Sequence, residues 1–280
     1  MRLNIEVTNI CPLPCHDDDR DRQHRPLGLM SLPTFRAVIN QSIHAGVKSV
    51  DIGGAGEPLL HPRLGDFISY LSRHTQDVTT RLVSNGLLLS PSLFKQFKKE
   101  GLSSVVVILS PQHLPLSQPN SGSEKARLLD NLATIGKESA DLQIIHANQA
   151  WSTEEKLSVR KFWAQRGIPN VGFSHRLACG VVLRSPDKKG HRPPSCNLYS
   201  HQHYVSWDGK LLSCCHDRSG ETENGNFTRD NLRNLIEKKT RIIERQYFYS
   251  ICYSCQDERR FPKRGTVGKM VNRLVSSIFS

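Results

Sequence analysis

The feature that most constrains the fold is an alternation of short apolar runs with longer amphipathic segments over the first 180 or so residues. Strands are expected at 2–8, 47–53, 78–83, 103–110, 142–147 and 171–177, and helices at 31–44, 62–73, 91–99, 124–138 and 153–165. This order predicts a parallel sheet covered by helices. The continuous apolar run at 105–109 is typical of a strand buried on both faces of such a sheet.

Unusual residues follow four successive predicted strands. Cys11 and Cys15 come after the first, 53–57 after the second, 84–86 after the third, and Ser110 after the fourth. In barrel-like α/β folds the chemistry lies at the carboxyl ends of the strands. The sequence therefore predicts that these residues meet at one functional edge of the sheet.

A cysteine-rich segment follows a linker-like stretch at 186–194. It contains Cys196, a predicted hairpin at 204–213 with Asp208-Gly209 at its turn, Cys214, a helix at 230–245, and the pair Cys252 and Cys255. A C-x-x-C pair with two further cysteines predicts a four-thiolate cage. Such a cage suits zinc or an iron–sulfur cluster, and the softness of thiolate does not decide between them. Cys215 is an alternative to Cys214 as a ligand.

Composition sets further limits. The chain carries eight cysteines and a formal net charge of +12, with no apolar run long enough to span a bilayer and no signal peptide at its start. We therefore expect a cytoplasmic protein in which disulfides are not favoured. The charge is dispersed, so nucleic acid is not an expected partner. The exception is the basic, amphipathic tail at 257–280, which suits either an anionic membrane surface or packing on the barrel.

Together these motifs resemble the radical S-adenosylmethionine (radical SAM) superfamily. The resemblance rests on the opening IEVTNICPLPC at 5–15, the segment RPLGLMS at 25–31, the glycine-rich GGAGEPLLHP at 53–62, the strand ends at 84–86 and 110, and the cysteine-rich segment. The last of these looks like a SPASM or "twitch" module, which holds an auxiliary 4Fe–4S cluster. The resemblance implies a partial (β/α)6 TIM-like barrel at 1–184, the cluster module at 185–256 and the tail at 257–280.

The resemblance also implies a set of site residues. It assigns SAM contacts to Gly54, Ala55, Gly56, Glu57, Ser84, Asn85 and Ser110, with Glu57 orienting the SAM amino group. It assigns the auxiliary cluster to Cys196, Cys214, Cys252 and Cys255. The first cluster motif departs from the family's C-x3-C-x2-C, because Asp18 stands where the third cysteine belongs, after Cys11 and Cys15. Three interpretations follow: Asp18 ligates the cluster iron, the site binds zinc or a single iron with His16, or it holds no metal.

The function implied is that of an enzyme that uses 4Fe–4S clusters and SAM to abstract hydrogen from a small molecule, such as an aminocyclitol or sugar, or from a peptide. An external electron donor such as flavodoxin or ferredoxin is then expected. The alternative is a catalytically inactive relative that retains only the C-terminal iron–sulfur or zinc site. A third class, binding to nucleic acid or membranes through the basic surface, has less support. Arg81, His146, Asn148 and His175 are expected to point into the barrel mouth.

Overall fold

The computed structural model of this 280-residue chain describes residues 1–13, 25–75, 77–109, 123–147, 151–174, 196–217, 219–244, 249 and 252. Several predicted site residues lie outside these ranges, namely Cys15, Asp18, Ser110, Asn148, His175 and Cys255. The tail at 257–280 lies outside them as well. In the described ranges, no helix has both the length and the apolar character needed to cross a membrane.

The predicted parallel sheet is confirmed. Its first six strands are β1 (Arg2–Ile5), β2 (Ser49–Ile52), β3 (Thr79–Ser84), β4 (Ser104–Leu109), β5 (Leu142–Ala147) and β6 (Val171–Ser174). They lie side by side in chain order and all pair in parallel. Consecutive parallel strands require crossover segments, and the helices between them supply these.

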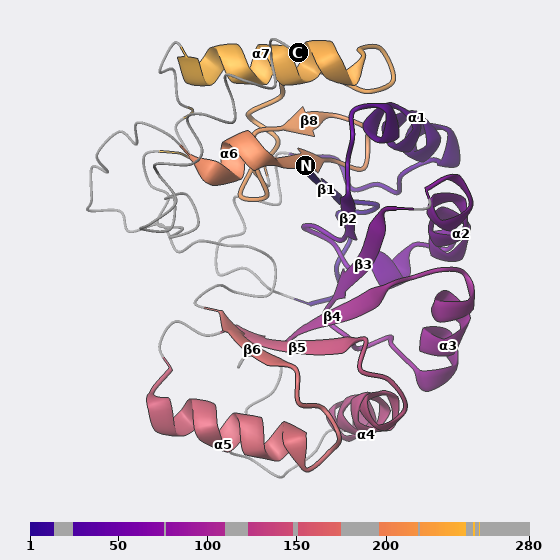
Figure 1. The fold of residues 1–280 in the computed structure, drawn as a ribbon, viewed down its shortest axis with the longest axis vertical. Helices are drawn as coiled ribbons and strands as arrows, with labels where there is room; N and C mark the ends of the chain where they lie inside the picture. The colour runs from indigo at the N-terminus through magenta and orange to yellow at the C-terminus, as the bar shows by residue number, and fades with distance from the viewer. Residues whose placement is uncertain are drawn as a thin grey trace.

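Five helices connect these strands. They are α1 (Leu32–His44), α2 (Leu64–His74), α3 (Pro91–Lys99), α4 (Ser123–Glu138) and α5 (Thr153–Ala164), with a short 3₁₀ helix η2 (Pro58–Leu60) before α2. Figure 1 shows α1 to α4 along one face of the curved sheet. The predicted start of α1 is confirmed, because the Ser31 hydroxyl accepts a hydrogen bond from the Thr34 amide at 3.1 Å.

The main hydrophobic core fills the space between the sheet and these helices. Phe35 of α1 and Phe67 of α2 stack with their ring centroids 4.3 Å apart. Ile52 and Leu82, from β2 and β3, are fully buried in the same cluster. Since side chains alternate along a strand, Asp51 and Arg81 lie on the opposite, inner face of the sheet. The helix-covered face is therefore the core, and the inner face carries polar groups.

The cysteine-rich segment extends this sheet. Its elements are α6 (Asn197–His201), β7 (Gln202–Val205), β8 (Leu211–Leu212) and α7 (Leu232–Glu244). Strand β7 pairs in parallel with β1 and antiparallel with β8, so the sheet has eight strands. The predicted hairpin is confirmed, with Gly209 at a φ of +84° in its turn. The predicted boundary near residue 184 thus separates two segments of sequence that share one sheet.

Candidate functional site

The glycine-rich loop after β2 lies against the start of the first cysteine motif. The Gly53 amide donates to the Ile5 carbonyl at 2.9 Å, and the Glu57 amide donates to the Ile10 carbonyl at 2.8 Å. A Cβ atom on Gly56 would lie 2.3 Å from the Thr8 carbonyl oxygen, so this approach requires glycine. Cys11 directly follows Ile10. The fold therefore brings together two motifs that lie more than 40 residues apart in the sequence.

Glu57 is buried, and its carboxylate is engaged within the chain. One oxygen accepts from the Leu59 amide at 3.0 Å and the Ser84 hydroxyl at 2.8 Å, and the other from the Asn85 amide at 2.8 Å. The side chain is 2% exposed. Burial raises the pKa of Glu57, while these three hydrogen bonds act in the opposite direction. The carboxylate thus joins the loop after β2 to the end of β3.

Asn85 provides a donor that no described group uses. Its side-chain oxygen accepts from the Leu87 amide at 3.0 Å, whereas its Nδ2 is buried without a hydrogen-bond partner among the described residues. The neighbouring Gly86 has a φ of +80° and donates to the Ser84 hydroxyl at 2.9 Å. An unpaired buried amide costs about 1–3 kcal/mol unless a ligand or water accepts from it. The predicted SAM contact at Asn85 is therefore chemically suited to a polar ligand.

Glu6 is a buried acid that the sequence reasoning missed. Its side chain is fully buried, and its carboxylate pairs with Arg25 and accepts from the Tyr204 hydroxyl at 2.7 Å. It also accepts from the Ala55 amide at 3.2 Å, in the glycine-rich loop. A Cβ atom on Gly54 would lie 2.7 Å from the Glu6 Cβ. The available signal was an acidic residue between the apolar Ile5 and Val7 of the predicted strand at 2–8.

Glu6 thereby connects four parts of the chain at the strand ends. They are β1, the glycine-rich loop, the segment after the first cysteine motif through Arg25, and the β7 strand through Tyr204. Arg25 and Glu6 have only 11% and 0% of their side chains exposed, so solvent screens this pair little. The position of the glycine-rich loop therefore depends on a buried ion pair as well as on backbone contacts.

Arg81 and His146, two residues predicted to point into the barrel mouth, lie on different faces of the sheet. Arg81 lies on the inner face, where its guanidinium donates to the Asp51 carboxylate at 2.7 and 2.9 Å. His146 does not face inward, so that prediction is wrong. It is buried, and its Nε2 accepts from the indole of Trp163 on α5 at 2.6 Å. Burial lowers the pKa of His146 to about 4, which keeps the ring neutral in this aromatic cluster.

The cysteine-rich segment carries four described cysteines. Cys196 directly precedes α6, Cys214 and Cys215 follow β8, and Cys252 lies beyond α7. Burial raises the pKa of Cys214 well above its ordinary value, and the charges of Cys215 and Cys252 raise it further. A backbone hydrogen bond from His216 and the charge of Lys239 act in the opposite direction. Cys214 is therefore a buried thiol that becomes a stable thiolate only with metal or cationic compensation.

The turn after Cys214 and Cys215 is fixed by Asp217. This buried carboxylate accepts from the amides of Glu221 and Thr222 at 3.0 and 2.8 Å, and from the Thr222 hydroxyl. The Thr222 hydroxyl in turn accepts from the Ser213 amide at 2.9 Å. Asp217 thus positions the backbone on either side of the two cysteines.

Lys239 is the second residue that the sequence reasoning missed. It lies on α7 and is 2% exposed. Its ammonium donates to the Gln202 carbonyl at 2.9 Å and lies 4.7 Å from the centroid of the Tyr199 ring. Burial lowers the pKa of Lys239 to about 8, while the charges of Cys214, Cys196 and Cys215 raise it. The segment that carries the predicted cysteine ligands therefore also contains a buried cation.

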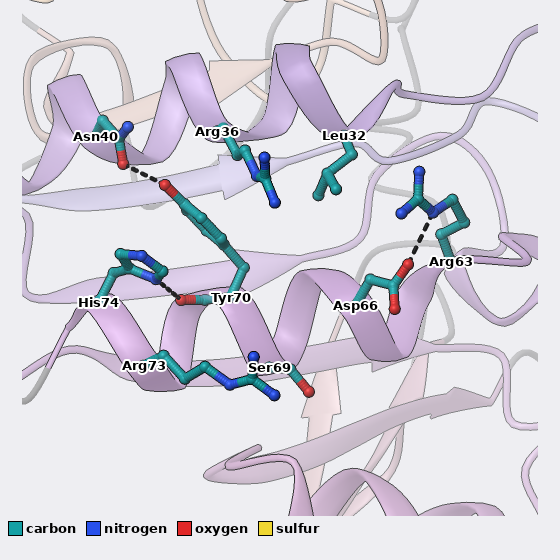
Figure 2. A pocket seen from close by; sticks show the side chains of 9 residues that line it. All are labelled: Leu32, Arg36, Asn40, Arg63, Asp66, Ser69, Tyr70, Arg73 and His74. Atoms are coloured by element: carbon teal, nitrogen blue, oxygen red, sulfur yellow. Dashed lines mark hydrogen bonds and ion pairs between the residues drawn. The ribbon is translucent and has the colours of Figure 1, made fainter.

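Two further observations bound the site. Among the described residues, no three of the His, Cys, Asp and Glu side chains gather closely enough to hold a metal ion. Cys196, Cys214 and Cys252 are described and do not form such a group, while Cys15, Asp18 and Cys255 lie outside the described residues, so both predicted ligand sets stay predictions. An open groove of about 670 Å³ lies elsewhere, between α1 and α2 (Figure 2). Its lining includes Arg36, Tyr70 and Arg73 but none of the predicted site residues.

No family model matches the chain, but two curated relatives are similar to it in sequence. A GTP 3',8-cyclase of Helicobacter pylori (strain HPAG1) is 37% identical over 97 residues, which are 33% of this chain and 30% of that protein. A GTP 3',8-cyclase of Aliarcobacter butzleri (strain RM4018) is 29% identical over 171 residues, or 59% of this chain and 52% of that protein. The matched regions therefore span about half or less of these relatives.

Three solved structures share the fold, each at a TM-score of 0.62. BtrN in complex with AdoMet and 2-DOIA is 15% identical, and the match covers 92% of this chain and 93% of BtrN. AnSMEcpe with bound AdoMet is 14% identical and covers 91% and 86%. Streptococcus suis SuiB bound to the precursor peptide SuiA is 14% identical and covers 91% and 69%. These likenesses confirm the predicted α/β fold class.

Proposed function

We propose that this chain, which has the partial-barrel fold of the radical SAM superfamily, is an enzyme that binds SAM at the carboxyl ends of β1 to β3. The observation that carries the proposal is the assembly of the glycine-rich loop, the start of the cysteine motif and the end of β3 into one hydrogen-bonded unit. That unit includes the buried, unpartnered Nδ2 of Asn85. A preformed site with an unused donor suits a polar ligand.

Within that site the side chains have different roles. Asn85 Nδ2 donates to an acceptor on SAM. Glu57 acts as a positioning residue, because its carboxylate holds the Asn85 and Leu59 amides and is buried. Glu6 positions the glycine-rich loop by accepting from the Ala55 amide. The backbone of Gly54 and Gly56 comes close to its neighbours and leaves no room for side chains on the protein side.

The first metal site would use Cys11 and Cys15, with Asp18 in place of the usual third thiolate. A 4Fe–4S cluster bound there would supply the electron that cleaves the SAM sulfonium bond and yields a 5'-deoxyadenosyl radical for hydrogen abstraction. A carboxylate is a harder ligand than thiolate and changes the redox potential of the iron it binds. Reduction would come from an external donor such as flavodoxin or ferredoxin.

The second metal site would use Cys196, Cys214, Cys252 and Cys255 to hold an auxiliary 4Fe–4S cluster. Thiolate is the usual ligand of such clusters. The burial of Cys214 and of Lys239, on whose pKa the charges of Cys214, Cys196 and Cys215 act, supports this proposal. The substrate class is a small molecule or a peptide. In this fold, BtrN is seen with 2-DOIA and SuiB with a peptide.

The direct test is anaerobic purification with iron and sulfide counted per chain, followed by a dithionite-driven assay for 5'-deoxyadenosine. About eight irons with deoxyadenosine formed is the expected result. About four irons without deoxyadenosine would instead support the inactive alternative, which retains only the C-terminal site. If the wild type holds fewer than about eight irons, the Asp18→Cys variant sharpens the test, because it restores the third thiolate and should increase the iron content if residue 18 occupies a ligand position.

SAM binding is tested separately by calorimetry. Asn85→Ala should weaken SAM binding about tenfold, which corresponds to roughly 1.4 kcal/mol for one buried hydrogen bond. Asn40→Ala is the matched control, since Asn40 lies in the outer groove of Figure 2. Equal affinities for the two variants would remove Asn85 from the proposed site. The absence of SAM binding by the wild-type protein would overturn the proposed function.

A further inference from the structure

The groove between α1 and α2 carries more positive than negative charge. Its walls contain three guanidiniums, those of Arg36, Arg63 and Arg73, against one carboxylate, that of Asp66. Leaving His74 aside, the groove therefore has a net charge of +2. It has a volume of about 670 Å³ and contains none of the residues assigned to SAM or to a metal. The proposed chemistry therefore does not account for this charge.

Two of the three arginines have no negative partner in the part of the chain that the structure describes. Arg63 donates to the Asp66 carboxylate at 2.7 Å. The Arg36 guanidinium lies over the Tyr70 ring, 5.3 Å from its centroid, and neither Arg36 nor Arg73 makes an ion pair or hydrogen bond with a described residue. Both side chains are exposed. A carboxylate of another molecule can therefore reach their N–H groups without displacing an existing pair.

Tyr70 fixes the shape of the groove. Its side chain crosses from α2 toward α1, where its hydroxyl donates to the Asn40 side-chain oxygen at 2.7 Å (Figure 2). The His74 ring stacks on it with centroids 4.0 Å apart, and His74 Nδ1 donates to the Tyr70 carbonyl at 2.8 Å. Tyrosine and arginine are enriched where proteins bind one another. The groove is therefore preformed and has the composition of a protein interface.

The length of the groove suits a short stretch of extended chain. Its lining on the α2 side runs from Arg63, just before the helix, to His74, the last helical residue. The 11 residues of α2 span about 16 Å at 1.5 Å per residue. An extended polypeptide covers that distance in about five residues. Small-molecule sites are typically enclosed and mostly apolar, whereas these walls are charged and exposed.

We propose that the groove between α1 and α2 binds an acidic, extended segment of a partner protein. Carboxylates of this segment pair with Arg36 and Arg73, the two guanidiniums that lack a negative partner among the described residues. Each guanidinium can donate two parallel hydrogen bonds to one carboxylate. The inference is independent of the proposed function, because the groove shares no residue with the SAM site or the metal sites.

The test measures binding of a fluorescein-labelled hexaglutamate peptide to the full-length protein by fluorescence anisotropy. The groove variant combines Arg36→Gln with Arg73→Gln, and the control variant combines Arg127→Gln with Arg233→Gln. The control arginines are exposed on α4 and α7. Both variants therefore have the same net charge. Low salt is used, since salt screens exposed charges.

The groove variant should lose at least tenfold in affinity for the peptide, and the control variant less than twofold. An equal loss in the two variants would show that net charge alone attracts the peptide, and would overturn the inference. The absence of binding to the wild type would overturn it as well. Tripolyphosphate and a hexathymidylate oligonucleotide are tested as competitors. If either binds the groove more tightly than hexaglutamate does, a phosphate ligand replaces the acidic protein segment.

Hydrogen exchange locates the bound peptide without any substitution. Hexaglutamate should slow amide exchange in α1 and α2 of the wild type. Slower exchange confined to other helices would contradict the inference. Because Arg36 and Arg73 are exposed, the groove variant should keep the unfolding midpoint of the wild type. If it does not fold, the exchange pattern of the wild type still decides where the peptide binds.

Discussion

The two candidate sites of this molecule balance their buried charges in different ways. At the strand ends, Glu6 is paired with Arg25, and Glu57 accepts three hydrogen bonds from its own chain. In the cysteine-rich segment, Lys239 is buried without a carboxylate among the described residues, and Cys214 is a buried thiol. The buried charges at the strand ends are therefore satisfied by partners within the chain, whereas the described part of the cysteine-rich segment shows no carboxylate paired with its buried lysine.

This difference predicts that metal removal affects the parallel sheet and the cysteine-rich segment differently. The parallel sheet and α1 to α5 are held by a continuous apolar core that needs no ligand. The segment around α6 and α7 is the one in which we propose a metal-thiolate site. We therefore expect metal removal to loosen the second region and leave the first intact.

The largest expected effect concerns the cysteine ligands. Cys214→Ser should abolish metal binding at the C-terminal site and reduce hydrogen-exchange protection in α6 and α7, because it removes a buried ligand. Cys215→Ser is the matched neighbour and should retain the metal, since the proposed ligand set contains Cys214 and not Cys215. Metal content and amide exchange measure both. The reverse result would make Cys215 the ligand, the alternative that the sequence leaves open.

The sequence predicts the barrel well because its signals there are local. Strand β5 (Leu142–Ala147) and helix α3 (Pro91–Lys99) have the expected bounds, and α1 begins at its predicted cap. Each element is defined by apolar periodicity and by a start or stop residue next to it. The likeness of the chain to BtrN, anSMEcpe and SuiB confirms the predicted α/β fold.

What the sequence did not reveal depends on contacts between distant residues. The pairing of β7 with β1, and the hydrogen bond from Tyr204 to Glu6, join residues almost 200 positions apart. The wrong prediction for His146 has a related cause. Strand β5 is apolar on both faces, so no alternation of polar residues reveals which face the histidine occupies. Its register with Leu109 places it on the helix side.

The next largest effect tests whether the strand-end site is complete without metal. Arg25→Met leaves the buried Glu6 carboxylate without its ion pair and should lower the free energy of unfolding by about 3–5 kcal/mol. Arg63→Met is the control, because its pair with Asp66 is more than half exposed and should contribute less than about 1 kcal/mol. Urea unfolding measures both. The loss of unfolding free energy in Arg25→Met should be the same with and without metal. A loss seen only in the metal-bound protein would contradict the expectation that the strand-end site is stable without metal.

A smaller effect concerns the shape of the glycine-rich loop. Gly56→Ala places a Cβ atom 2.3 Å from the Thr8 carbonyl oxygen, so the loop must move. We expect a loss of about 1–3 kcal/mol in stability together with weaker SAM binding. Gly172→Ala is the control, since its Cβ would meet only ordinary van der Waals contacts. Thermal unfolding measures the loss of stability, and calorimetry measures SAM affinity. Unchanged SAM affinity in Gly56→Ala would show that this loop does not contact SAM.

The smallest expected effect is a pH dependence at Glu57. Because burial raises the pKa of Glu57 above its ordinary value of 4.5, the folded protein holds this proton more tightly than the unfolded chain. The stabilising contribution is therefore complete below pH 4.5 and is lost as the pH rises through the raised pKa. Glu57→Gln removes this titration, so its stability relative to the wild type should increase over that range. Unfolding midpoints of both proteins, measured against pH, give the difference. A difference that falls with rising pH would show that the hydrogen bonds from Leu59, Ser84 and Asn85 outweigh burial, and would make the strand-end site complete only with an ionised Glu57.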